Sequence, residues 1–144
     1  MRATLTRRIT FSAAHRYRRP EWSDARNTEV FGACAWPNWH GHTYVCDVTV
    51  GGEIDPLTGF CVDLAALDAV LRDEVVARLD HRNLVLDVPE FAEGKLIPTT
   101  ENIAAWVARV VQEGLSTARV ERVRVAEEPG LWAEVVPVAS TDAA

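Results

Sequence analysis

Polar and apolar side chains alternate along residues 3–15, the first patterned segment of the chain. One parity contains Leu5, Ile9, Phe11, Ala13 and His15, whereas the other contains mainly threonine, arginine and serine. A period of two predicts a half-buried strand, which here ends at a histidine. Residues 40–50, HGHTYVCDVTV, are also strand-like. Residues 16–39 show no clear period and predict a long loop, and such loops inside a compact domain are usually functional or disordered.

Two later segments have the period of an amphipathic helix. Asp63 is suited to cap a first helix that runs to about Leu79. A second helix is expected to begin near Thr100 and to end near Gly114. The apolar positions at helical spacing are Leu64, Leu67, Leu71 and Val75 in the first helix, and Ile103, Val107 and Val110 in the second.

Turn residues separate the remaining expected strands. The DPLTG sequence at 55–59 predicts a turn before a short strand at 60–62. Pro129-Gly130 predicts a turn between two final strands, at about 120–127 and 131–138. The order β-β-β-α-α-β-β, with strands grouped as hairpins, predicts an α+β fold with an antiparallel sheet and the helices on one face.

Size and composition restrict the class of protein. The 144 residues fit one domain spanning 1–144, in which only Ser140 to Ala144 resemble a loose tail. A net charge of −6 argues against a nucleic-acid partner. No apolar stretch has the length of a membrane span or an export signal. The three cysteines at irregular spacing predict no disulfide framework, so we expect a cytosolic protein.

Four histidines occur in the chain, and three of them lie at expected strand ends. His40 and His42 are two residues apart, so their rings point to the same side of a strand with Cα atoms roughly 6.5 Å apart. His15 ends a strand that could lie alongside. Three neutral imidazoles leave one tetrahedral position open, which is typical of a catalytic zinc site. The alternative is that this His-x-His pair binds no metal and that His15 is a satisfied polar residue.

Six short motifs follow one another in a fixed order from about residue 5 to residue 137. They are FSAAHRY (11–17), Cys34 followed by HGH (40–42), GEIDPLTG (52–59), LDHRNL (79–84), PTTEN (98–102) and the glutamate in VAEE (125–128). In this combination the chain resembles the 6-pyruvoyl-tetrahydropterin synthase family, which includes the bacterial 6-carboxy-tetrahydropterin synthases. Each motif is weak alone, but all six in order are highly specific.

The resemblance implies the T-fold, an antiparallel four-stranded sheet with two helices packed on one face. It also implies trimers whose sheets join into a barrel, two of which stack as a homo-hexamer with active sites between subunits. Closing a barrel in this way would remove the exposed edges of a small sheet.

The resemblance also implies a role for particular residues. His15, His40 and His42 correspond to the zinc ligands, Cys34 to the catalytic cysteine, Asp80 and His81 to the pair that assists it, Glu127 to the carboxylate that binds the pterin, and Thr99, Thr100 and Glu101 to further pterin contacts. We expect Arg16 to contact phosphate. Without the resemblance, simpler interpretations remain: an inert thiol for Cys34, a surface carboxylate for Asp80, a loop histidine for His81, a helix cap for Thr100, and a solvated arginine run for Arg18 and Arg19.

The activity implied is the conversion of 7,8-dihydroneopterin triphosphate to 6-pyruvoyl-tetrahydropterin with release of triphosphate, the step that leads to tetrahydrobiopterin. Zinc and His81 near Cys34 could keep this cysteine as the thiolate base. The six-residue spacing from Cys34 to His40 is similar to that of the pyruvoyl synthases. The alternative is a 6-carboxy-tetrahydropterin synthase, which also releases acetaldehyde and serves queuosine synthesis.

Two tryptophans depart from the family pattern. Trp39 stands where the pyruvoyl type usually has glycine, and Trp36 is also unusual, so an altered pterin substrate or product remains open. Alternatives of another class are a non-catalytic pterin-binding subunit and a zinc hydrolase that uses Glu101.

Overall fold

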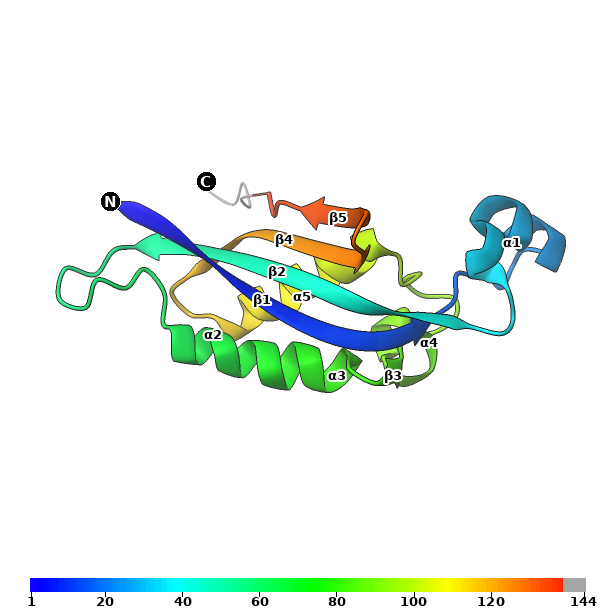
Figure 1. Ribbon diagram of the computed structural model, residues 1–144, viewed down its shortest axis with the longest axis horizontal. Coiled ribbons are helices and arrows are strands. Elements are labelled where there is room, and N and C mark those ends of the chain that lie inside the picture. The colour runs from blue at the N-terminus through cyan, green and yellow to red at the C-terminus, as the bar shows by residue number, and fades with distance from the viewer. Residues whose placement is uncertain (139–144) are drawn as a thin grey trace, which may run out of the picture.

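A five-stranded sheet forms one layer of the computed structural model, which describes residues 1–138 (Figure 1). The strands are β1 (Arg2–His15), β2 (His40–Glu53), β3 (Arg82–Asn83), β4 (Arg119–Glu128) and β5 (Leu131–Val135). Their order in the sheet is β3-β1-β2-β4-β5. The four long strands are antiparallel, as expected, and the two-residue β3 adds a short parallel edge beside β1.

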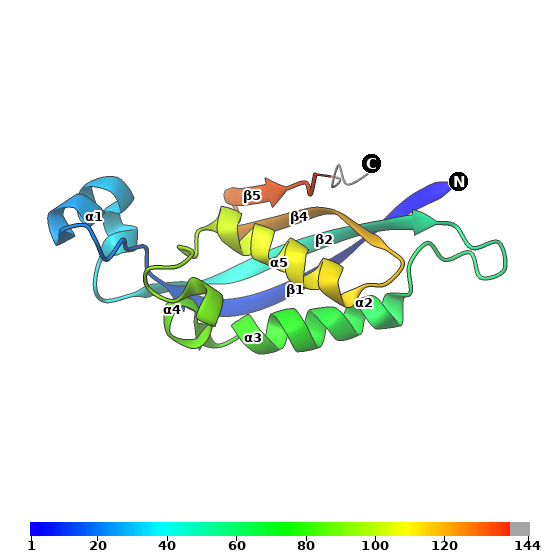
Figure 2. The same cartoon turned by 180° about the vertical axis from the view of Figure 1, so that it is seen from behind.

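Helices cover one face of this sheet, as Figure 2 shows from behind. One continuous rod runs through α2 (Leu64–Val70), a π-helical stretch η2 (Leu71–Val76) and α3 (Ala77–Leu79). Beside it lies α5 (Thr100–Gly114), and α4 (Leu84–Asp87) with the 3₁₀ turn η3 (Pro89–Phe91) connects the two. The α+β class with helices on one face is therefore confirmed. No helix within residues 1–138 has the length and apolar character of a membrane span.

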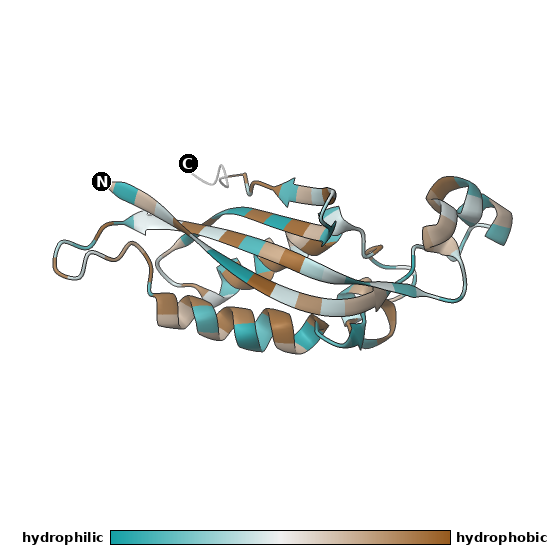
Figure 3. Ribbon diagram, viewed as in Figure 1, coloured by the Kyte–Doolittle hydropathy of each residue, from teal (hydrophilic) through white to brown (hydrophobic). Residues whose placement is uncertain are grey.

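The long hairpin of β1 and β2 fixes which side chains share a face. Its register runs without interruption from Arg2 opposite Glu53 to His15 opposite His40. Phe11 and Tyr44 face each other within it and stack with ring centroids 5.0 Å apart. Figure 3 shows the alternation of polar and apolar residues along these strands. The apolar face packs against the helices and forms the core.

The expected helices begin and end close to their predicted positions. The side chain of Asp63 caps the first helix by accepting a hydrogen bond from the backbone of Ala66 at 3.0 Å. The predicted apolar positions are buried, except that Leu64 is 41% exposed because it lies in the first turn, beyond the edge of the core. The buried positions are Leu67, Leu71, Val75, Ile103, Val107 and Val110.

The prediction of an unbroken loop at 16–39 was wrong. This segment contains α1 (Asp24–Phe31) and the 3₁₀ turn η1 (Gly32–Ala35), which lie at one end of the molecule (Figure 1). Ser23 caps α1 by accepting a hydrogen bond from the backbone of Arg26 at 3.1 Å. The helix has no apolar stripe, since its one buried residue is the polar Asn27. Hydrophobic periodicity therefore could not reveal it.

The predicted strand at 60–62 does not form. The Asp55 side chain accepts hydrogen bonds from the backbone of Leu57 and Thr58, and Asp55 N donates to the Phe60 carbonyl at 2.9 Å. These contacts make a closed turn without a ladder, and Phe60 remains 67% exposed. At the other end of the chain, β5 stops at Val135 instead of residue 138, and the expected tail at 140–144 lies outside the described residues.

Candidate metal and pterin site

Three histidine rings meet at the end of the β1–β2 hairpin. His15 and His40 are direct cross-strand partners, and His42 lies one pleat further along β2. Directly opposed residues and residues two apart on a strand share one face of a sheet. The ring centroids accordingly lie 4.6 Å apart for His15–His40, 5.1 Å for His15–His42 and 5.2 Å for His40–His42. The register of the hairpin thus brings His15 next to two histidines that follow it by 25 and 27 positions in the sequence.

Hydrogen bonding determines which nitrogen of His15 faces the cluster. Its Nδ1 lies 2.9 Å from the carbonyl oxygen of Pro98, and a carbonyl oxygen only accepts. Nδ1 therefore carries the proton, and Nε2 presents a lone pair. The hydroxyl of Tyr44 lies 3.0 Å from the same Nδ1 and supports this orientation. Nε2 of His15 in turn lies 2.9 Å from Nε2 of His40.

The environment keeps these rings neutral. His15 is fully buried, and burial is the main cause that lowers its pKa to about 4. Burial also lowers the pKa of His40, with a smaller contribution from the charge of His42. At neutral pH these two rings therefore carry no charge. A neutral imidazole is the form that binds a metal ion.

The donor set fits a divalent transition-metal ion. One nitrogen from each of His15, His40 and His42 lies within 4.8 Å of the others. Nε2 of His42 is buried and has no hydrogen-bond partner within the described part of the chain. Buried polar atoms are rarely left unpaired, so this nitrogen requires a partner that protein atoms do not supply. Three imidazoles suit zinc with one open position for substrate.

The carboxylate of Glu127 points toward the same place. Glu127 shares the inner face of β4 with the fully buried Val123 and Val125. Its Oε2 is buried without a partner among residues 1–138 and lies 3.9 Å from Nε2 of His42. The neighbouring Glu128 is exposed, as the parity of the strand predicted. A buried, unpaired carboxylate is a strong acceptor for a ligand that offers N–H donors.

Cys34 lies in η1 on the side of this carboxylate. Its carbonyl accepts a hydrogen bond from the backbone of Tyr17 at 2.8 Å, and the Tyr17 ring packs edge-on against His15 at 4.8 Å. Burial and the charge of Glu127 raise the pKa of the Cys34 thiol. This direction is opposite to the thiolate expected from the sequence, and no cation among residues 1–138 offsets it.

Asp80 and His81 instead lie at the edge of β1 that pairs with β3. The backbone of Ser12 donates to Asp80 Oδ1 at 2.8 Å, and His81 N donates to the Ser12 carbonyl at 2.6 Å. His81 Nδ1 lies 3.0 Å from Asp80 Oδ2, and the His81 side chain is 83% exposed. His81 also has a left-handed backbone, with φ +59°. No hydrogen bond or ion pair within residues 1–138 joins this pair to Cys34.

The segment before α5 places the two threonines and Glu101. Thr99, not Thr100, caps the helix, since its hydroxyl accepts from the backbone of Asn102 at 3.2 Å. Thr100 is buried, and Glu101 is exposed in the first turn. The charge of Glu101 contributes to raising the pKa of Tyr17, so it lies on the Cys34 side of the cluster.

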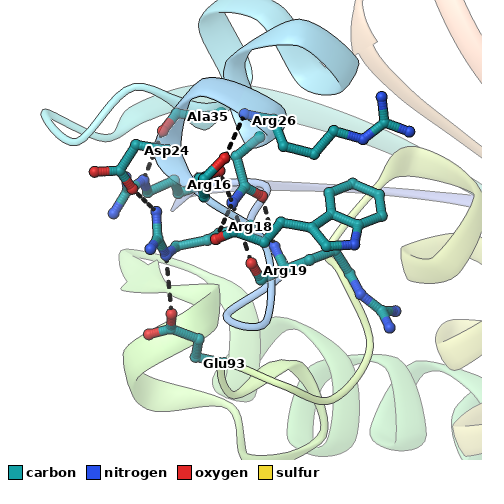
Figure 4. Close-up of polar contacts among 10 residues, drawn as sticks. Arg16, Arg18, Arg19, Asp24, Arg26, Ala35 and Glu93 are labelled. Carbon is teal, nitrogen blue, oxygen red and sulfur yellow. Dashed lines mark hydrogen bonds and ion pairs between the residues drawn. The ribbon is translucent and has the colours of Figure 1, made fainter.

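The arginine run after His15 divides into free and paired cations (Figure 4). Arg18 pairs with Asp24 at 2.6 Å and with Glu93 at 3.2 Å. Arg19 pairs with Glu21. Arg16 donates from Nε to the carbonyl of Ala35 at 2.9 Å, which leaves its terminal nitrogens without an ion pair among the described residues.

Sequence reasoning missed Tyr44, Pro98 and Tyr17 at this site. Tyr44 has the same strand parity as His42, so its position could have been found from the pattern. The contact from Pro98 could not, because it depends on how the segment before α5 packs against β1.

Comparisons with known proteins find relatives that match most of the chain. The family profile described as 6-pyruvoyl tetrahydropterin synthase matches residues 4–137. A human 6-pyruvoyl tetrahydrobiopterin synthase is 43% identical over 125 residues, which cover 87% of this chain and 85% of that protein. A dihydroneopterin monophosphate aldolase of Pyrococcus furiosus is 35% identical over 117 residues, 80% of each chain.

A solved structure extends the likeness to three dimensions. The 6-pyruvoyl tetrahydropterin synthase of Caenorhabditis elegans superposes with a TM-score of 0.88 at 35% identity, covering 96% of this chain and 97% of that one. The T-fold expected from the motifs is thereby confirmed. The chain belongs to the 6-pyruvoyl tetrahydropterin synthase family.

Proposed function

We propose that this protein is a zinc-dependent lyase that converts 7,8-dihydroneopterin triphosphate to 6-pyruvoyl-tetrahydropterin and releases triphosphate. The observation that carries the proposal is a pair of buried atoms at the cluster, His42 Nε2 and Glu127 Oε2, for which the described residues supply no hydrogen-bond partner. One is a metal ligand and the other an acceptor for an N–H donor. Because they are only 3.9 Å apart, one small ligand could reach a metal ion with its side chain and Glu127 with its ring, which supports the proposal.

Glu127 orients the substrate. The amino-pyrimidine edge of a pterin offers adjacent N–H donors, and a carboxylate can accept two of them in parallel. Such a bidentate contact fixes the plane of the ring as well as its position. Thr99, Thr100 and Glu101 lie at the start of α5. We propose that they contact the pterin ring on the side opposite Glu127.

His15, His40 and His42 would hold the zinc ion. When bound there, zinc supplies a Lewis acid that makes the C–H bonds beside a coordinated hydroxyl more acidic. The fully buried His15 and its bond to Pro98 keep one ligand rigid and exclude water on that side. Arg16, whose terminal nitrogens have no ion pair within the described residues, is the proposed phosphate contact.

Cys34 is the proposed base that moves a proton between the substrate side chain and the ring. Because its pKa is raised in the single chain, a nearby cation would favour the thiolate at neutral pH. We propose that the exposed Asp80–His81 pair of a neighbouring subunit supplies this cation. The site would then be complete only in an oligomer, in which open edges of the sheet also become paired. A trimer-based hexamer meets both requirements.

The test is to incubate zinc-loaded protein with 7,8-dihydroneopterin triphosphate and to identify the products by mass. The proposal predicts triphosphate and 6-pyruvoyl-tetrahydropterin. Acetaldehyde would establish the carboxy-forming alternative, whereas binding of the pterin without turnover would establish a non-catalytic subunit. Cys34→Ala should abolish turnover, and Cys61→Ala, which removes another half-buried thiol, should leave it unchanged. Equal activity of both variants would contradict the role of Cys34.

A further inference from the structure

Trp39 has a strained backbone directly beside the metal ligands. Its φ is +60°, in the left-handed region that glycine adopts easily and that bulky side chains rarely enter. Trp39 immediately precedes His40, so the strain is located at the start of β2. Strain of this kind persists where the surrounding structure requires it, and it is often found at binding sites.

The indole of Trp39 forms part of the wall of a cavity of about 230 Å³. Arg16, Arg18, Glu93 and Lys95 line the same cavity, and most of the remaining lining is apolar. Pro98, which holds His15 through its carbonyl, closes it on the side of the histidine cluster. Arg16 follows His15 in the chain, and Trp39 precedes His40. Together with Pro98, these residues place the cavity next to the metal site.

The charges inside this cavity do not cancel. Arg18 bridges Asp24 and Glu93, so this three-residue cluster has one negative charge in excess (Figure 4). Lys95 is the only lysine in the sequence, and it forms no ion pair within residues 1–138. Arg16 likewise keeps its terminal nitrogens free. Arg16 and Lys95 together outweigh the excess negative charge of the Arg18 cluster, so the cavity keeps a positive charge within a largely apolar wall, in a protein whose net charge is −6.

We propose that this cavity binds the phosphate end of an anionic ligand and that Trp39 is a specificity-determining residue in its wall. Low-dielectric walls concentrate the field of like charges in a cleft, so the indole strengthens the attraction of Arg16 and Lys95 for phosphate. The proposal rests on the proposed function, because it places the triphosphate of the substrate beside the zinc site.

The test measures binding of inorganic triphosphate to zinc-loaded protein by calorimetry, without any pterin. Lys95→Ala should weaken binding about tenfold, the loss expected for one charge-assisted contact. Trp39→Gly should weaken it about threefold to tenfold while raising the thermal midpoint, because the left-handed strain is relieved. Trp39→Phe should restore affinity, because it rebuilds the apolar wall. The controls are Arg119→Ala and Trp36→Gly, which remove an exposed cation and an exposed indole elsewhere.

Unchanged binding in Lys95→Ala, or unchanged binding in Trp39→Gly, would overturn the proposal. Failure of the proposed function gives a different result. Triphosphate binding that depends on Lys95, together with no conversion of the pterin substrate, would refute the lyase activity and leave the anion site intact. Conversion of the pterin substrate that does not change in the Lys95 and Trp39 variants would refute the anion site and leave the lyase activity intact.

Discussion

Nδ1 of His15 donates a hydrogen bond to the carbonyl oxygen of Pro98 over 2.9 Å, and this contact links the segment before α5 to the end of β1. It leaves Nε2 unprotonated in a ring that is fully buried. The other two histidines come from β2, so two strands supply the donor set and the segment before α5 orients one of its rings.

Glu127→Gln should remove the charge that recognises the pterin. The amide can accept only one of the two hydrogen bonds, and it places an N–H₂ against an N–H donor. We expect the affinity for neopterin, which carries no phosphate, to fall by about 1.5–3 kcal/mol, roughly 10- to 100-fold. Fluorescence titration measures this loss. Glu128→Gln, on the exposed face of the same strand, is the matched control, and equal affinities of the two variants would refute the role of Glu127.

Alkylation of Cys34 should depend on pH in a characteristic way. Because burial and Glu127 raise its pKa in the single chain, the thiolate of the metal-free protein, dissociated into monomers, should form only above the pH at which a free thiol titrates, about 8.5. The rate of reaction with iodoacetamide, followed at Cys34 by peptide mass mapping, should rise through a midpoint above that value. Cys61 provides an internal reference in the same sample. A midpoint for Cys34 below that of a free thiol would contradict the description of its surroundings.

Gly41→Ala should disturb the metal site although it changes no ligand. A Cβ at Gly41 would lie 2.9 Å from the backbone carbonyl oxygen of Ala13, so β1 and β2 would have to move apart. We expect a loss of about 1–3 kcal/mol in stability and at least a tenfold loss of zinc affinity. In Gly130→Ala the added methyl meets open space, so zinc affinity should not change. Normal zinc binding by Gly41→Ala would show that the register of the hairpin does not control the site.

Asn27→Ala should loosen the segment that carries Cys34. The buried Asn27 amide donates to the carbonyls of Arg19, Trp22 and Ser23 and accepts from the backbone of Arg19. Loss of this network should lower the local opening free energy by about 2 kcal/mol, since several hydrogen bonds of a buried amide are lost together. Amide hydrogen exchange in residues 19–31 should accelerate roughly 30-fold, whereas Asn38→Ala, at an exposed site, should have no effect. Unchanged exchange in Asn27→Ala would contradict this role.

The parts of the fold that depend on regular periodicity were predictable from the sequence. The alternation ending at His15 gave the first strand, and Asp63 marked the first helix start. Helix α1 was missed because its stability depends on the buried polar Asn27 and a serine cap, not on an apolar stripe. The strand at residues 60–62 was wrongly predicted because a turn followed by apolar residues does not reveal whether a neighbouring strand is available for pairing.

The candidate site was predictable where strand geometry determined it. The spacing of His40 and His42 placed two rings on one face, and the parity of Glu127 directed it inward. The tautomer of His15 depends on Pro98, 83 residues away in sequence, and no local pattern contains that information. The sequence predicted His81 close to Cys34. In the single chain His81 lies instead beside Asp80, at the edge of β1. The identity of the metal, the hexamer and the cytosolic location stay predictions.

The most direct test is a titration of metal-free protein with Co²⁺, a spectroscopic substitute for zinc, followed by visible absorption. One equivalent should produce the intense bands of a four-coordinate site with three nitrogen ligands. His40→Ala and His42→Ala, at half-buried positions, should remove this signal while the protein remains folded. A spectrum that is unchanged by either substitution, or the absence of stoichiometric binding by the folded wild-type protein, would contradict a metal centre at the three histidines.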